Sequence, residues 1–249
     1  MKNVSFKDFT KATLQFLFGY ENYLFVFSVF NIKRIQWTKY EETFQFFLTL
    51  IPKNGVILDI GANIGMMSTV IAKKLPEASI YSFEPIPSNI RTIKRVFIFF
   101  KIKNIILSEI AVGNMNGEIE MVLPIISNSK RQGLSHIRES NNEEAWNNGE
   151  IFKVPINKID DISDLWGNKT VSAIKLDVEN YEFEVLNGAR NLIEHSKPIV
   201  YTELWANQTR TNCINFFKEL NYDAKIYENG QLIDFVFQNE INFYFIPKV

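Results

Sequence analysis

The sequence of 249 residues contains one cysteine and two histidines, and these shortages exclude several classes of protein at once. A single cysteine, Cys213, allows neither an internal disulfide nor a four-thiolate zinc site. The two histidines, His136 and His195, are too few for a histidine-rich metal site. The formal net charge is only −1, so the composition gives no reason to expect nucleic-acid binding.

Long apolar runs and linkers are also missing. The most apolar run, Tyr23 to Phe30, is far shorter than the roughly 20 residues that span a bilayer. Met1 to Lys11 lack a signal-peptide cleavage pattern, so we expect a cytoplasmic protein. Residues 1–50 read as a helical extension that either packs on the domain, which we favour, or exposes aromatic side chains to a lipid-linked substrate or a membrane surface. Residues 51–249, with no repeat or linker, read as one domain.

The most informative stretch is Val56-Ile-Leu-Asp-Ile-Gly-Ala-Asn-Ile-Gly65. Its apolar first half predicts a buried strand, and the apolar spacing that follows it predicts a helix. Gly61 permits a sharp turn and the close approach of a ligand. A dinucleotide-binding turn would have glycine in place of Asn63, and Asp59 would repel phosphate. The turn therefore suits a ligand with a cationic part, such as the amino group and sulfonium of S-adenosylmethionine.

Strands alternate with helices along the rest of the chain, which predicts a mostly parallel α/β sheet covered on both faces. The last two expected strands flank a turn at Asn229-Gly230. The seven strands expected in this sheet are residues 56–60, 79–83, 105–112, 172–178, 198–204, 224–227 and 241–246, and residues 118–123 are also expected to be strand-like. Residues 124–150 interrupt this rhythm and are longer than a usual connection, so they are either disordered or functional, and we favour a substrate lid.

Acidic side chains stand where three of these strands end. Glu84 lies 23 positions after Gly61, where an acid binds the ribose diol of NAD or S-adenosylmethionine. Asp177 and Glu203 end two later strands, and on neighbouring strands they would form a general base or a site for a divalent cation such as Mg²⁺. His136 is a further candidate base because histidine titrates near neutral pH, the alternative being a solvated side chain.

Four motifs in this order resemble those of FkbM-type S-adenosylmethionine-dependent methyltransferases. They are Leu58-Asp-Ile-Gly-Ala-Asn-Ile-Gly65, Phe83-Glu-Pro85, Ile174-Lys-Leu-Asp-Val-Glu179 with Tyr181-Glu182, and Tyr201-Thr-Glu203. The resemblance implies a class I, Rossmann-like α/β fold, with a doubly wound, mostly parallel seven-stranded sheet that has one antiparallel strand. It also implies O-methylation, which in this family often modifies hydroxyls of sugars or glycosylated natural products. The expected partner is a small molecule or glycan with a free hydroxyl.

The resemblance also assigns roles to individual residues. At the cofactor it places Asp59, Gly61, Ala62, Asn63 and Gly65 by the methionine end, Glu84 and Pro85 by the ribose, Glu109 and Ala111 by the adenine, and Asp177 and Glu179 near the transfer site. The candidate catalytic residues are Asp177, Glu203 and His136. The family usually has glycine where this chain has Asn180, and asparagine tolerates left-handed backbone angles, so we expect the turn to be kept.

Two other functions compete with this interpretation. An NAD-dependent oxidoreductase or epimerase would also use Glu84, but the third phosphate-clearing glycine and a Tyr-x-x-x-Lys pair are missing. A non-catalytic cofactor-binding subunit would keep the fold, and Asn180 and the lack of an unmistakable base motivate it. We favour the methyltransferase. The sequence indicates neither the oligomeric state nor whether a metal is needed.

Overall fold

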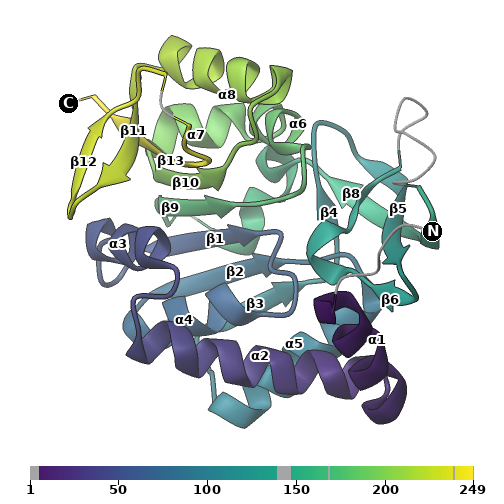
Figure 1. Ribbon diagram of the computed structural model, residues 1–249. Coiled ribbons are helices and arrows are strands. Elements are labelled where there is room, and N and C mark those ends of the chain that lie inside the picture. Colours follow the sequence, from purple (N-terminus) through teal and green to yellow (C-terminus); the bar gives the residue numbers. More distant parts are fainter. Residues whose placement is uncertain (1–5, 139–146, 168, 238, 249) are drawn as a thin grey trace.

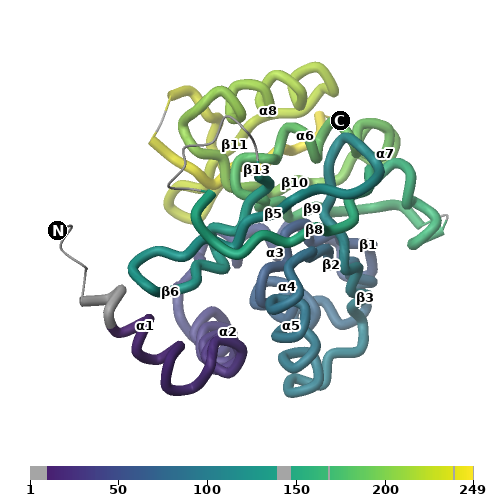
Figure 2. The backbone as a smooth tube through the Cα atoms, turned by 90° about the vertical axis from the view of Figure 1, so that its right-hand side faces the viewer, coloured from purple at the N-terminus to yellow at the C-terminus, as the bar shows by residue number. Residues whose placement is uncertain are grey.

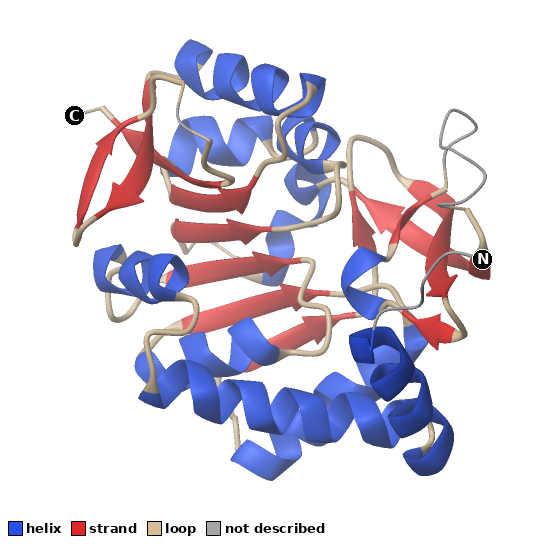
Figure 3. Cartoon of the chain, viewed as in Figure 1, coloured by secondary structure: helices blue, strands red, loops and turns tan. Residues whose placement is uncertain are grey.

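The computed structural model describes residues 6–138, 147–167, 169–237 and 239–248, and the predicted α/β architecture is confirmed (Figure 1 and Figure 3). The strands of the large sheet are β1 (Val56–Ile60), β2 (Ser79–Phe83), β3 (Ile105–Ser108), β9 (Val171–Leu176), β10 (Ile199–Glu203), β11 (Tyr222–Glu228), β12 (Gln231–Asp234) and β13 (Asn242–Pro247). The helices are α1 (Phe6–Phe18), α2 (Tyr20–Trp37), α3 (Glu42–Leu50), α4 (Met66–Lys74), α5 (Pro87–Phe100), α6 (Glu182–Asn187), α7 (Arg190–Ser196) and α8 (Gln208–Glu219).

The large sheet has the strand order β12-β11-β13-β10-β9-β1-β2-β3. The strands from β3 to β10 in this order are parallel, whereas β13 is antiparallel to both β10 and β11. The seven predicted strands are therefore present, but the predicted count is wrong because β12 adds an eighth. Asn229 and Gly230 both have positive φ and reverse the chain directly from β11 into β12. β12 is an exposed or half-buried edge strand, so no apolar pattern marks it.

Successive residues of the central strands face two different helical layers, because side chains alternate along a strand. Ile57 of β1 packs in one core with α2, α3, α4 and α5, while Leu58 packs in a second core with α6, α7 and α8. Val200 and Tyr201 of β10 divide in the same way. Figure 2 shows the two helical layers on opposite sides of the sheet.

Helices α2 and α3 belong to the first of these layers and pack on the sheet and its loops. Phe47 of α3 stacks on Tyr201 of β10, with ring centroids 5.2 Å apart. Ser28 of α2 donates a hydrogen bond from Oγ to the carbonyl oxygen of Ile64, at 2.8 Å. This is the packing that we favoured from the sequence, while a domain boundary at residue 50 stays a prediction.

A second sheet lies beyond the carboxyl ends of the large-sheet strands (Figure 1). Its strands are β4 (Ala111–Val112), β5 (Gly117–Ile126), β6 (Ser129–Lys130), β7 (His136–Ile137) and β8 (Gly149–Asn157), and two 3₁₀ helices, η1 (Gln132–Leu134) and η2 (Ile159–Leu165), adjoin it.

This small sheet changes two of the expectations from the sequence. The predicted strand 105–112 is two strands, because β3 ends at Ser108 and β4 pairs with β8 instead. The predicted lid, residues 124–150, includes the end of β5, then β6, η1, β7 and the start of β8, so its described part is not a plain loop. Residues 139–146 lie outside the described residues. Strands of two residues are too short to show an alternating pattern, and the lid role itself stays a prediction.

Candidate active site

The turn after β1 is shaped by two neighbouring segments. Gly61 has φ +78°, and a Cβ placed on it would lie 1.9 Å from the carbonyl oxygen of Asp177. The backbone N–H groups of Gly61 and Ala62 both donate to the carbonyl oxygen of Phe83, at 3.1 and 2.9 Å. Glycine is thus required at position 61 by the end of β9 as well as by a left-handed turn. Gly65, which begins α4 with φ +75°, faces α5 at Ile93.

Glu84 joins this turn to the end of β2. Its carboxylate accepts hydrogen bonds from the N–H of Asn63 at 2.8 Å, the N–H of Ile86 at 2.9 Å and the side-chain amide of Asn89 at 3.1 Å. Burial raises the pKa of Glu84 to about 7, although these hydrogen bonds act in the opposite direction. The side chain that the sequence assigns to the ribose is therefore already oriented by the protein.

A buried lysine, Lys175 on β9, holds the centre of the site together. Its Nζ donates to the carbonyl oxygen of Gly61 at 2.9 Å and lies 3.4 Å from a carboxylate oxygen of Asp59 and 3.5 Å from one of Asp177. Burial alone would lower the pKa of the Lys175 ammonium, but the charges and hydrogen bonds of Asp177 and Asp59 outweigh it and hold that pKa above its usual range. Lys175 therefore stays charged. No role was predicted for it from the sequence.

Asp59 lies beneath the turn and does not line the cavity described below. Its side chain is fully buried, and its second carboxylate oxygen accepts a short hydrogen bond from Ser68 Oγ, which in turn accepts one from Ser82 Oγ. Asp59 and Lys175 are also partners in the parallel register of β1 and β9, which places both side chains on one face of the sheet. The structure thus makes Asp59 a residue that positions Lys175 and the turn.

A second turn, after β9, carries the remaining acids of the site. Glu179 and Asn180 have φ of 55° and 71°, so the left-handed turn is kept although asparagine replaces the family glycine. The carboxylate of Glu182 accepts hydrogen bonds from the N–H groups of Val178 and Asn180, at 3.2 and 3.3 Å. Asn180 Oδ1 accepts a further bond from Asn207 Nδ2, at 2.7 Å. These contacts fix a strained segment, as is common at functional sites.

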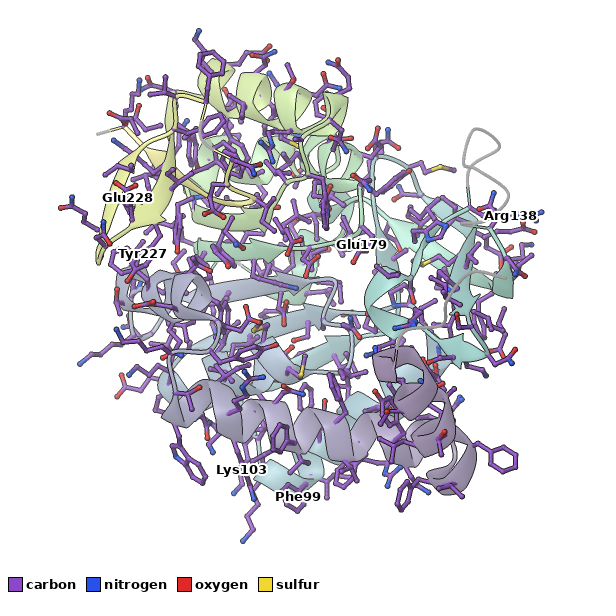
Figure 4. All side chains as sticks on the ribbon, viewed as in Figure 1. Phe99, Lys103, Arg138, Glu179, Tyr227 and Glu228 are labelled. Atoms are coloured by element: carbon purple, nitrogen blue, oxygen red, sulfur yellow. The ribbon has the colours of Figure 1, made fainter. Side chains whose placement is uncertain are left out.

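Glu179 is the exceptional side chain of this turn. It is partly buried and forms no hydrogen bond or ion pair with any residue that the structure describes. Burial, together with the charges of Asp177 and Glu203, raises the pKa of Glu179 to about 8. Figure 4 shows it between the large sheet and the small sheet. Burial and the charge of Asp177 also raise the pKa of Glu203, to about 7.

A cavity of about 650 Å³, its open mouth included, lies between the carboxyl ends of β1, β2 and β9 and the small sheet. Seven of the predicted residues line it: Gly61, Asn63, Glu84, Pro85, Ala111, Asp177 and Glu179. The opposite wall includes Met121, Gln132, Gly133, Ser135, Ile137 and Tyr181, none of which was predicted as a site residue. All but Met121 carried some signal, because Tyr181 stands in a motif and the other four lie in the predicted lid.

Six predicted residues do not line this cavity. Asp59, Ala62 and Gly65 support the turn behind it, and Glu203 ends β10 beside it. Glu109 is a correction, because its half-exposed carboxylate pairs with Lys94 on α5, 2.5 Å away. His136 is a second correction: its chain neighbours Ser135 and Ile137 line the cavity, whereas His136 itself does not, and its buried ring lies with Nδ1 2.9 Å from the carbonyl oxygen of Leu134.

The cavity wall fits S-adenosylmethionine. Two buried acceptors in it, Oδ1 of Asn63 and Oδ1 of Asn89, have no hydrogen-bond donor among the described residues, and hydroxyl or amino groups of a ligand would supply one. The carboxylates of Glu84, Asp177 and Glu179 suit a ribose diol, an ammonium and a sulfonium, and would repel a pyrophosphate. Within the described ranges, no group of three or more His, Cys, Asp or Glu is placed to hold a metal ion.

Comparison with known proteins gives distant relatives. The chain is 22% identical over 165 residues to the AMB antimetabolite synthetase AmbE of Pseudomonas aeruginosa, a match that covers 56% of this chain and 8% of that protein. It is 24% identical over 149 residues to Methyltransferase 1 of Beauveria bassiana, covering 55% of this chain and 59% of the relative. The chain thus spans only part of the curated relatives that it matches.

Structural comparison supports the fold. A crystal structure of methyltransferase FkbM from Methylobacillus flagellatus superposes with a TM-score of 0.52 at 17% identity, covering 78% of this chain and 44% of that one. The Methyltransferase FkbM domain itself matches residues 59–237, which is more than half of the chain and includes every cavity-lining motif. The chain therefore belongs to the FkbM methyltransferase domain family, whose methyl donor is S-adenosylmethionine.

Proposed function

We propose that the protein transfers the methyl group of S-adenosylmethionine to a hydroxyl group, and that the acceptor is a sugar in a glycan, glycolipid or glycosylated metabolite. The observation that carries the proposal is Glu179, a carboxylate in the cavity wall that has no hydrogen-bond or ion-pair partner among the described residues and whose pKa is raised to about 8. A sugar hydroxyl is weakly acidic, so its methylation benefits from a base whose pKa lies near the working pH. A carboxylate held this way suits that task better than the inward-packed His136.

The protein's share of the mechanism follows from the residues of the two turns. When bound, S-adenosylmethionine would supply a methyl group that is activated by its sulfonium: the acceptor oxygen bonds to the methyl carbon in line with the C–S bond that breaks, and S-adenosylhomocysteine leaves. Glu84 orients the ribose, and Asn63 and Asn89 offer free acceptor oxygens to the cofactor. Glu179, once ionised, takes the proton of the acceptor hydroxyl. Lys175 keeps the two turns at a fixed separation through its contacts to Gly61 and Asp177.

An exposed tryptophan just after the carboxyl end of β10 supports a sugar as the acceptor. Trp205 follows β10 two residues after Glu203, and about half of its surface is exposed. A flat indole offers an apolar face on which the C–H face of a sugar ring packs, together with an N–H that can bond to a hydroxyl. Glu203 and Asp177 add acceptors for further hydroxyl groups beside it.

The test uses labelled methyl transfer from S-adenosylmethionine into a cell-envelope extract, followed by mass spectrometry of the glycans and glycolipids. Glu179→Gln should lower the transfer rate by roughly 10²–10⁴-fold, because it removes the general base, and calorimetry should show retained cofactor affinity. Glu109→Gln is the matched control, since that carboxylate pairs with Lys94 outside the cavity, and it should keep full activity. Full activity of Glu179→Gln would remove Glu179 from the mechanism.

The same measurements separate the competing functions. Binding of NAD without binding of S-adenosylmethionine would overturn the methyltransferase and support the oxidoreductase. Binding of S-adenosylmethionine with no transfer to any fraction of the extract would support the non-catalytic subunit. Label on protein or nucleic acid instead of carbohydrate would leave methyl transfer standing and contradict the sugar acceptor.

A further inference from the structure

The outer surfaces of α2 and α5 form a continuous apolar and basic face, which we call the α2/α5 face. Its apolar members are Val26, Phe30 and Trp37 of α2 and Ile98 and Phe99 of α5, each with half or more of its surface exposed. Val26, Phe30 and Trp37 are spaced four and seven residues apart, so they lie on one side of α2. The two helices are in contact, since Phe25 of α2 meets Phe99 edge to face at 5.7 Å.

Basic side chains predominate on this face, and the acids at its edges, Glu21 and Glu109, pair with Arg91 and Lys94. Neither residues 22–39 nor residues 85–108 contain any Asp or Glu, whereas together they contain eight Lys and Arg: Lys33, Arg34, Lys39, Arg91, Lys94, Arg95, Lys101 and Lys103. The whole chain carries a net charge of only −1, so this basic excess is local and is balanced elsewhere. Figure 4 shows Phe99 and Lys103 together at the lower edge of the molecule, pointing away from the sheet.

We propose that the α2/α5 face binds the surface of an anionic lipid bilayer. Large apolar side chains among lysines and arginines are the pattern of an interfacial helix, whose apolar groups enter the acyl boundary while its basic groups meet the lipid phosphates. Burying Phe30, Trp37 and Phe99 in this way would also remove them from water. No helix in the described part of the chain is both long and apolar enough to cross a membrane, so the contact is a peripheral one.

Other occupants fit this face less well. A second copy of the chain, docked through the same face, would bring like charges against each other across the interface. A nucleic acid would be attracted by the lysines and arginines but would leave the exposed aliphatic groups of Val26 and Ile98 without a counterpart. A bilayer accommodates both kinds of side chain.

The position of the face relative to the cavity gives this binding a use. Helix α1 packs on α2 and continues the apolar surface with Phe16, Leu17 and Phe18, all mainly exposed. Gln15 of α1 exchanges two hydrogen bonds with the backbone of Lys130 on β6, at 3.0 and 3.1 Å. The small sheet, which lines the cavity, is thereby tied to the helices that would touch the bilayer. If the proposed methyl transfer holds, the acceptor class is a lipid-linked hydroxyl compound.

Cosedimentation of the full chain with vesicles tests the proposal without depending on methyl transfer. The protein should bind vesicles of phosphatidylcholine with phosphatidylserine, bind phosphatidylcholine alone more weakly, and lose affinity as salt is added. The double variant Lys101→Glu with Lys103→Glu should lower the affinity roughly tenfold or more, since each charge near the surface contributes. Its control is Lys169→Glu with Lys218→Glu, an equal charge change at exposed lysines elsewhere, which should bind as the wild type does.

The apolar contribution has its own matched pair. Phe30→Ser should weaken vesicle binding, whereas Phe237→Ser, a change at a still more exposed phenylalanine after β12, should not. Calorimetry with S-adenosylmethionine should give the wild-type affinity for all these variants, which shows that they are folded. Failure of the wild type to bind anionic vesicles, or equal losses in variants and controls, would overturn the proposal. So would self-association or RNA binding through these residues in the absence of vesicle binding.

Discussion

Removing the charge of Lys175 should destabilise the protein strongly, because that charge is buried between two carboxylates. Lys175→Met keeps the length of the side chain but leaves Asp59 fully buried without its cation, and it removes the hydrogen bond to Gly61. Loss of one partner of a buried ion pair costs about 3–5 kcal/mol. With a urea dependence of about 3 kcal/mol per M for a domain of this size, the unfolding midpoint should fall by about 1–1.7 M.

A double-mutant cycle then shows whether the cost comes from the stranded carboxylate. Adding Asp59→Asn to Lys175→Met removes the second charge, so the pair should cost less than the sum of the single variants, with a coupling of about 1–3 kcal/mol. Lys169→Met, at an exposed lysine, is the control and should leave the midpoint unchanged. A cost below about 1 kcal/mol for Lys175→Met, or strict additivity in the cycle, would refute the assigned role.

Two further predictions follow from the turns and their carboxylates. Gly61→Ala should destabilise the fold by more than about 1 kcal/mol and weaken cofactor binding, because the new Cβ would lie 1.9 Å from the carbonyl oxygen of Asp177 and the residue has a positive φ. Urea unfolding measures the stability and calorimetry measures the binding, and wild-type values in both would contradict the packing described. Burial raises the pKa of Glu84 to about 7 and that of Glu179 to about 8, both above the value in the unfolded chain, so the folded, ligand-free protein favours the protonated form of each carboxyl group. These groups therefore stabilise the fold at low pH, and this contribution is lost as the pH rises through the folded pKa values. The melting temperature should therefore fall from about pH 5 to about pH 8, while affinity for the cationic cofactor rises over the same range, and opposite slopes would reject the assignment.

The parts of the fold that could be predicted from the sequence are those in which chemistry and local pattern coincide. The turn between β1 and α4 lies between an apolar strand and an apolar helical period, and these follow one another without interruption from Val56 to Lys74, so its shape and place were predictable. Glu84 and Asp177 were also predictable as cavity residues, because the carboxyl ends of parallel strands meet at one edge of a sheet.

What escaped prediction depends on register and on short elements. The role of Lys175 rests on its pairing with Asp59 across two strands that are more than 100 residues apart, and a single sequence does not reveal such a register. His136 was misplaced for a related reason, because one step along a short strand turns a side chain from the cavity to the opposite face. Glu109 lies between β3 and β4, where its carboxylate pairs with Lys94. The three two-residue strands of the small sheet are too short to show a pattern, whereas its long strand β5 includes the strand expected at residues 118–123.

The amide of Asn207 links two parts of the site that a glycine at position 180 would leave independent. Its Oδ1 caps α8 by accepting from the N–H of Arg210, while its Nδ2 donates to Asn180. One small side chain thus connects the turn after β9 to the start of α8, so a substitution at position 180 or 207 affects the hydrogen bonding of the other. Asn207→Asp would keep the acceptor that caps α8 but would lose the N–H group that bonds to Asn180. The side chain at position 207 therefore has to match the one at position 180.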